Sequence, residues 1–308
     1  MKNIVYYSCV VMIGFSVFFT TTVFALVDTM FWWQPYEGGN FGDELSRVIV
    51  EKMLGRQVKN LPWDTQEKKL LAAGSIVQFA RDGDVIWGSG FRGDPIPENN
   101  FHRLDVRAVR GPKTREFLLK RRIKCPAVYG DPALLMSYLF PEFKTKKPIL
   151  DYIIIPNIGE ISCFTSYKNV VVPTLPWRKI VQKITQSRLV ISSSLHGIIV
   201  AESFGIPARL LKMTWVEPLF KYQDYYESTG RKHFRYATSV QDALKWGGEK
   251  PGFIDLKPLL DSFPCDYFNT PSNVRKGCKA VCVGRHFPED EVLRNQSISL
   301  DKNQTSNS

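Results

Sequence analysis

The sequence is poor in cysteine and lacks the short signatures of several common enzyme classes. Six cysteines among 308 residues are too few and too scattered for a disulfide scaffold. No G-x-S-x-G elbow, H-E-x-x-H helix or Walker A loop is present, which argues against serine hydrolases, zinc peptidases and P-loop NTPases. Charged residues make up 23% and hydrophobic residues 44%, so the composition excludes a disordered or collagen-like chain.

The charge balance favours an anionic partner. Lysine and arginine number 41 against 30 aspartate and glutamate residues, a net charge of +11. Much of the excess lies between Arg103 and Lys124. Because this basic stretch is confined and no nucleic-acid motif accompanies it, we expect no nucleic-acid partner.

The N-terminus is set apart by hydrophobicity. Residues 4–27 carry no charged side chain, and a bilayer is spanned by roughly 20 residues. Val23 and Ala25 fit the small residues that signal peptidase prefers. Residues 1–29 are therefore a signal or anchor segment, or the start is miscalled and translation begins at Met30. The first case predicts the secretory pathway or membrane association, the second the cytoplasm.

Beyond residue 30, short apolar runs alternate with helical patterns. Strands are expected over residues 31–33, 84–87, 127–129, 152–155, 170–172 and 189–191. Helices are expected over residues 44–54, 113–122, 177–185 and 198–204. Gly55 suits a helix C-cap and Pro112 a first helical position. The alternation predicts an α/β fold with parallel sheets covered by helices.

A polar, proline-containing stretch at residues 144–148 predicts a linker between two halves. We expect an N-terminal half over residues 30–146 and a C-terminal half over residues 147–287, facing each other across a ligand cleft. Residues 288–308 lack periodicity and are expected to be a disordered tail. The late cysteines Cys265, Cys278 and Cys282 allow a local disulfide, although buried free thiols explain them more simply.

The first loop with chemical potential contains Asn40, Gly42 and Asp43. It follows an expected strand and precedes a helix, a place where the backbone can approach a ligand closely. A helix cap and turn would explain the same residues.

A second loop, residues 88–93, matches G-x-G-x-x-G and includes Gly88, Ser89 and Gly90. The proline-containing segment that follows cannot open the helix that a dinucleotide site requires. We therefore expect a glycine loop that lines the cleft. Just before it, Asp82 and Asp84 resemble the D-x-D of metal-dependent glycosyltransferases, but an Asp-Gly turn explains them more simply, and we expect no metal.

Two arginines flank a strand-like run that ends at Gly111 and Pro112. Arg110 stands beside the N-terminus of the following helix, where a guanidinium and backbone amides can converge on an anion. Arg107 precedes it on the same run. Both are candidate anion ligands.

A serine-rich loop before another helix contains Ser193, Ser194, Leu195 and His196. Hydroxyls, free amides and an imidazole at a helix N-terminus suit a phosphate or carboxylate. We favour an anion-binding or acid–base role for His196 over a structural one. Asp131 also falls at the carboxyl end of an expected strand, where a turn-capping role explains it equally well.

Taken in order, these stretches resemble the polysaccharide pyruvyl transferase family, and are most similar to its bacterial exopolysaccharide ketal-pyruvate transferases. The resemblance covers roughly residues 31–215. The stretches that carry it are Asn40-Phe41-Gly42-Asp43, Trp87-Gly88-Ser89-Gly90, Arg107-Ala108-Val109-Arg110-Gly111-Pro112, Gly130-Asp131-Pro132-Ala133, Ser193-Ser194-Leu195-His196-Gly197 and Phe204-Gly205-Ile206-Pro207.

The resemblance implies two Rossmann-like halves in a GT-B-like architecture. It implies phosphoenolpyruvate as donor substrate, with no cofactor, and a hexose of a glycan or lipid-linked oligosaccharide as acceptor. The products would be a pyruvate ketal and phosphate. His196 would act as acid or phosphate ligand, Arg110 would hold the anion, and Asp43 or Asp131 would act as base or position the acceptor.

One position departs from the family pattern. Many members have arginine two residues before the motif histidine, where this chain has Ser194. The donor anion would then rely on Arg110, Arg107 or another cation. A GT-B-like glycosyltransferase with a nucleotide-sugar donor is the main alternative, because it shares the architecture. A non-catalytic glycan-binding module is a more distant third.

Overall fold

The computed structural model describes residues 28–35, 38–95, 101–145 and 147–268. The hydrophobic segment 4–27, Cys278, Cys282 and the tail 288–308 lie outside these ranges. Within the described ranges, no helix combines the length and the apolar character needed to cross a bilayer.

The N-terminal half is built on short parallel strands. These are β1 (Thr29–Met30), β2 (Lys59–Asn60), β3 (Leu70–Leu71), β4 (Val85–Trp87) and β5 (Asp105–Ala108). Strands β3, β4 and β5 form one sheet in that order, and β1 pairs with β2. Parallel bridges from Phe31 to Leu71 and from Val109 to Tyr129 extend the same arrangement. Its helices are α1 (Phe41–Leu54), α2 (Pro112–Lys120), α3 (Met136–Leu139) and the 3-10 turns η1 (Val77–Phe79), η3 (Pro132–Leu135) and η4 (Pro141–Phe143).

The C-terminal half contains a second parallel sheet. Its strands β6 (Ile153–Ile155), β7 (Val190–Ser192), β8 (Ala208–Leu211) and β9 (Tyr236–Ala237) are hydrogen-bonded in sequence order. The accompanying helices are η5 (Ile158–Phe164), α4 (Trp177–Thr185), α5 (Leu195–Ser203), α6 (Phe220–Ser228) and α7 (Val240–Trp246). The last helix, α8 (Lys257–Asp261), packs on the N-terminal half. The predicted α/β class with parallel sheets is confirmed.

The helix boundaries follow local signals. Helix α1 ends at Gly55, which adopts a φ of 70° and donates its N–H to the Glu51 carbonyl at 2.8 Å. Pro112 occupies the first turn of α2, as expected of a residue without an amide hydrogen. Both predicted boundary residues are confirmed.

Successive side chains of a strand point to opposite faces of the sheet, so one strand can contribute to two hydrophobic cores. In β4, Val85 and Trp87 belong to the largest core, whereas Ile86 belongs to a second core on the opposite face. The largest core also takes residues of α1, α4, α5 and the inner face of the second sheet, so the two halves share it. Burying one large apolar side chain contributes about 1.5–3 kcal/mol.

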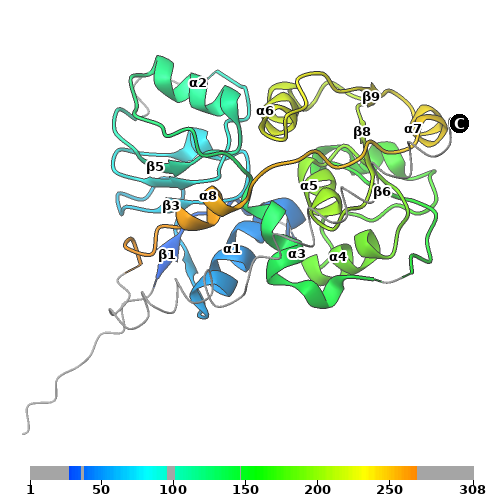
Figure 1. Ribbon diagram of the computed structural model, residues 1–308, viewed down its shortest axis with the longest axis horizontal. Coiled ribbons are helices and arrows are strands. Elements are labelled where there is room, and N and C mark those ends of the chain that lie inside the picture. Colours follow the sequence, from blue (N-terminus) through cyan, green and yellow to red (C-terminus); the bar gives the residue numbers. More distant parts are fainter. Residues whose placement is uncertain (1–27, 36–37, 96–100, 146, 269–308) are drawn as a thin grey trace, which may run out of the picture.

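After α7 the chain returns to the N-terminal half. Trp87 Nε1 donates to the Leu259 carbonyl at 2.9 Å, and its ring meets Phe263 edge-on with centroids 4.8 Å apart. The Tyr267 hydroxyl lies 3.0 Å from the Thr29 carbonyl oxygen. Figure 1 shows α8, in orange, beside the N-terminal strands, and α6, in yellow, near α2. The division at residue 146 stays a prediction.

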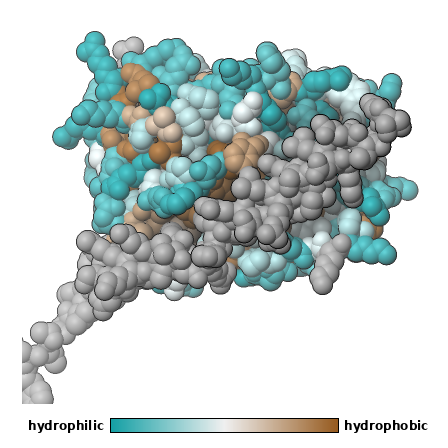
Figure 2. All heavy atoms as spheres, in the orientation of Figure 1, coloured by the Kyte–Doolittle hydropathy of each residue, from teal (hydrophilic) through white to brown (hydrophobic). Residues whose placement is uncertain are grey.

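Where described residues are in view in Figure 2, much of the surface is hydrophilic. Figure 2 shows hydrophobic residues gathered mainly over the part that carries α2 and β5. A shallow depression there is lined partly by Leu104, Val106 and Leu119.

Candidate active site

A cavity of about 320 Å³ is lined by residues from both halves. The first turn of α1 contributes Asn40, Gly42 and Asp43, and the first turn of α5 contributes Ser194, Leu195 and His196. The remaining lining residues are Trp33, Ser75, Ile76, Gln78, Phe79, Arg92, Asn157, Ile158, Glu217 and Lys221. Each of the two helices follows a parallel strand, so the cavity lies at the carboxyl ends of β1 and β7.

The N-terminal turns of α1 and α5 are in direct contact. A β-carbon placed on Gly42 would overlap the His196 imidazole, lying 2.8 Å from its Cγ atom. First-turn amides lack intrahelical partners and mark the positive end of the helix dipole. Two such ends facing one cavity favour an anionic ligand.

His196 is held between Gly42 and a buried carboxylate. Its Nε2 atom lies 3.6 Å from Asp131 Oδ2, and both atoms are buried without a hydrogen-bond partner in the described structure. Asp131 Oδ1 accepts the Ala133 amide at 2.9 Å and caps η3. The capping role predicted for Asp131 is therefore present, and its second oxygen faces the imidazole. A carboxylate at Nε2 orients the ring and leaves Nδ1 on the side of α1.

Asp43 is poised for proton exchange near neutral pH. Burial raises its pKa from 3.8 to about 6, against the opposing influence of His196, the Asn40 amide and Lys221. Asn40 Nδ2 donates to Asp43 Oδ2. A carboxyl group with such a pKa can give or take a proton at the pH of most enzymes.

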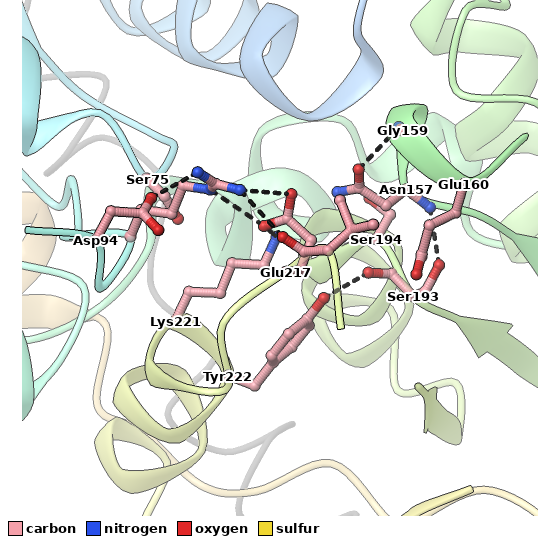
Figure 3. Close-up of polar contacts among 12 residues, drawn as sticks. Ser75, Asp94, Asn157, Gly159, Glu160, Ser193, Ser194, Glu217, Lys221 and Tyr222 are labelled. Carbon is pink, nitrogen blue, oxygen red and sulfur yellow. Dashed lines mark hydrogen bonds and ion pairs between the residues drawn. The ribbon is translucent and has the colours of Figure 1, made fainter. Parts of the chain in front are cut away.

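Three charged residues that the sequence analysis did not select lie on the cavity wall. Glu217 accepts from Lys221 Nζ at 2.5 Å and lies 3.4 Å from the Arg92 guanidinium. Figure 3 shows Glu217 next to Lys221, with Asn157 and Ser194 on the opposite side. Burial lowers the pKa of Lys221, and the Glu217 carboxylate opposes that shift. The pair places a buried ammonium beside the cavity.

The two arginines predicted to bind the anion lie elsewhere. Arg110 is fully buried; its Nε atom pairs with Asp224 Oδ2 at 3.0 Å, and Nη1 and Nη2 donate to Ser75 Oγ and the Phe91 carbonyl at 2.5 and 2.7 Å. Its guanidinium therefore stands behind the cavity wall. Arg107 pairs with Asp105 and Asp266 at 2.6 and 2.7 Å and does not line the cavity.

The glycine loop after β4 supports the wall without lining the cavity. Gly88 donates its amide to the Ala108 carbonyl at 2.9 Å, and Ser89 Oγ donates to the Gly74 carbonyl at 3.0 Å. Gly90 packs on Arg110, because a β-carbon there would lie 2.6 Å from Nε. The loop thus has a supporting position in this structure, and its direct binding of substrate stays a prediction.

Ser193 has a similar supporting position. Its hydroxyl accepts the Asn157 amide at 2.8 Å, and its carbonyl accepts the Tyr222 hydroxyl at 2.7 Å (Figure 3). It thereby fixes two segments that carry the lining residues Asn157 and Lys221.

The described residues contain no cluster of three or more His, Cys, Asp or Glu arranged to hold a metal. Asp82 accepts the amides of His102 and Arg103 at 2.5 and 2.8 Å, and Asp84 pairs with the buried Lys69 at 2.7 Å. The turn explanation of this Asp-Gly-Asp stretch agrees with these contacts.

The fold and the cavity define an α/β protein with parallel sheets and a polar cavity lined by the N-terminal turns of α1 and α5. The polysaccharide pyruvyl transferase family model matches residues 40–212, more than half of the chain. The chain belongs to this family of transferases, as the ordered motifs predicted.

Individual relatives are more distant. Succinoglycan biosynthesis protein ExoV of Rhizobium meliloti is 26% identical over 212 residues, 65% of this chain and 64% of that protein. An uncharacterized protein of Acanthamoeba polyphaga mimivirus is 26% identical over 189 residues, 58% of this chain and 63% of its own. This chain thus spans slightly less than two thirds of either relative.

A solved structure of a functionally uncharacterized protein of Klebsiella pneumoniae subsp. pneumoniae aligns over 65% of this chain and 87% of its own. The identity is 14% and the TM-score 0.38.

Proposed function

We propose that the protein transfers the pyruvyl group of phosphoenolpyruvate to a hexose of a polysaccharide or lipid-linked oligosaccharide. The observation that carries this proposal is the convergence of Asp43, His196 and two helix N-termini on one cavity, in a chain of the polysaccharide pyruvyl transferase family. The name of the relative ExoV, a succinoglycan biosynthesis protein, agrees with a polysaccharide acceptor.

The proposed reaction needs one proton donor, one proton acceptor and anion contacts. Protonation of the methylene carbon of phosphoenolpyruvate makes the neighbouring carbon electrophilic, and one sugar hydroxyl adds to it while losing its proton. A second hydroxyl of the same sugar then displaces the phosphate, to which its proton goes. The balance is one donor and one diol giving one ketal and one phosphate.

His196 is the proposed acid. Asp131 lies 3.6 Å from Nε2 and orients the imidazole, while Nδ1 faces the side of α1. Asp43 is the proposed base for the first sugar hydroxyl, because its raised pKa of about 6 makes it a stronger base than an ordinary aspartate. Asp131 touches His196 rather than the cavity and is a positioning residue.

The donor anion would be held by first-turn amides of α1 and α5 and by Lys221, with Arg92 nearby. In this proposal, these groups replace Arg107 and Arg110 as ligands of the donor anion. Phosphoenolpyruvate is a substrate here, and the proposed steps need no cofactor.

A GT-B-like arrangement of the halves is part of the proposal. It is supported by two parallel α/β sheets with a cavity between helix ends of both halves, and by the return of residues 256–268 to the N-terminal half.

The test incubates the full chain with phosphoenolpyruvate and a panel of methyl hexosides and disaccharides, following phosphate release and product mass. We expect phosphate release that depends on the acceptor, and a sugar product that carries a pyruvate ketal. UDP-glucose and UDP-galactose are the comparison donors. Sugar transfer from either, without turnover of phosphoenolpyruvate, would overturn the proposal in favour of a glycosyltransferase.

A further inference from the structure

The most exposed large hydrophobic side chain among the described residues stands close to the cavity. Trp215 is 80% exposed, and its neighbour Val216 is 52% exposed. They belong to the loop between β8 and α6, and Glu217, two residues after Trp215, lines the cavity. Single exposed apolar side chains are ordinary on a protein surface, so the argument depends on the place of Trp215 beside the cavity and on how its loop is held.

This loop is held in place at both ends. Lys212 Nζ donates to the carbonyl oxygens of Thr214 and Glu217 at 3.1 and 2.6 Å, and the Thr214 hydroxyl bonds to the buried Glu160. Arg92 Nη2 donates to the Val216 carbonyl at 3.3 Å. The indole is thus presented by an anchored loop, and its position relative to the cavity is fixed by contacts with both halves.

One face of the Trp215 indole ring already contacts a cation. The Lys212 ammonium lies 5.0 Å from the ring centroid, a cation–π distance. With 80% of the residue exposed, the ring still offers broad apolar surface to a ligand. The ligand that suits an apolar, π-rich plane edged by polar groups is a pyranose, whose C–H bonds form an apolar face and whose hydroxyls form a polar edge.

We propose that Trp215 is a stacking platform for the acceptor glycan, binding the sugar unit next to the hexose that reacts in the cavity. This inference rests on the proposed pyruvyl transfer and adds an acceptor subsite to it. The platform lies outside the cavity wall, so a single hexose seated at Asp43 does not need it. A disaccharide can occupy both places and gains the stacking contact.

The kinetic test compares Trp215→Ala, Trp215→Phe and the control Phe253→Ala, which removes another exposed aromatic ring (55%) that is not a cavity-lining residue. We expect Trp215→Ala to raise KM for a disaccharide acceptor about tenfold, equivalent to about 1.4 kcal/mol. KM for phosphoenolpyruvate, KM for the methyl hexoside and the unfolding temperature should not change. Trp215→Phe should retain most of the disaccharide affinity. An unchanged disaccharide KM in Trp215→Ala would overturn the platform.

A binding measurement separates failure of the platform from failure of the proposed function. The full chain is labelled with 5-fluorotryptophan, and the resonance of Trp215 among the seven tryptophans is assigned by its loss in Trp215→Phe. If no pyruvyl transfer is found, a shift of this resonance with lactose or cellobiose still supports a sugar platform. No shift with either disaccharide overturns it.

Discussion

The imidazole of His196 lies against the α-carbon of Gly42, which joins the first turn of α5 to the first turn of α1. A side chain at position 42 would occupy the space of the ring, with its β-carbon 2.8 Å from Cγ of His196. The absence of a side chain at Gly42 on α1 therefore sets the position of the His196 imidazole on α5.

Gly42→Ala should displace His196 and reduce pyruvyl transfer at least about 100-fold, with a loss of stability of about 1–3 kcal/mol from overpacking. Steady-state kinetics and urea unfolding measure the two effects. Gly39→Ala is the matched control, because a β-carbon at Gly39 meets no atom within 4 Å. Wild-type activity in Gly42→Ala would show that the close contact does not position the histidine.

Asp43 should give stability a defined pH dependence. Its pKa is raised from 3.8 in the unfolded chain to about 6 in the folded protein, so the folded state binds this proton more tightly. Its contribution to stability is fully present below about pH 4 and is lost as the pH rises through about 6. Compared with wild type, Asp43→Asn should therefore gain stability as the pH rises from about 4 to about 7.

Urea unfolding across that range tests the Asp43 prediction. Glu44→Gln is the control variant at the next position of α1, where the carboxylate pairs with Arg47 at 2.9 Å and does not line the cavity. Parallel stability profiles of Asp43→Asn and wild type would contradict the raised pKa.

Arg110→Met should lower the free energy of unfolding of the protein, and not only its activity. Asp224, which also accepts the Thr114 amide at 2.8 Å, would be left as an uncompensated buried charge at a cost of about 3–5 kcal/mol. The double variant Arg110→Met, Asp224→Leu should recover part of this loss in urea unfolding. If Arg110→Met kept wild-type stability and lost only phosphoenolpyruvate binding, Arg110 would return to the anion site.

Lys221→Met should raise KM for phosphoenolpyruvate by about 10- to 100-fold, the range expected for a lost charge-assisted hydrogen bond of about 1.5–3 kcal/mol. KM for the acceptor should change little. Lys257→Met is the control, since its side chain is 60% exposed and pairs with Asp261 on α8. An equal effect of both variants, or none from Lys221→Met, would remove Lys221 from donor binding.

Local signals made much of the fold predictable. Helices α1 and α4 have apolar periodicity, α5 is an apolar run buried on all sides, and Gly55 and Pro112 are clear end residues of α1 and α2. Several strands are continuous apolar runs. Helix α6 was missed because its buried residues include Lys221 and Asp224. These charges are buried only because Glu217 and Arg110 neutralise them. Such pairing produces no hydrophobic periodicity in the sequence. Strand β3 has only two residues and is too short to show a pattern.

In the candidate site, too, some features could be predicted from the sequence and others could not. The grouping of Asp43, Asp131 and His196 could be predicted because each follows a strand, and parallel strands place such positions at one edge. Their catalytic roles stay predictions. The buried pairing of Arg110 could not be predicted because its partner, Asp224, lies 114 residues further along the chain. Position beside a helix N-terminus gave Arg110 the appearance of an anion ligand. Only the folded structure shows that the Arg110 guanidinium is already paired with a carboxylate.

The most direct test of the account uses phosphoenolpyruvate labelled with carbon-13 at its central carbon, together with an accepting hexoside. For the wild-type protein we expect the label in a ketal carbon bound to two sugar oxygens, with an equal amount of phosphate released. His196→Ala should form no ketal while unfolding at the wild-type temperature. Label that never reaches any acceptor, or normal ketal formation by His196→Ala, would contradict pyruvyl transfer or its proposed acid.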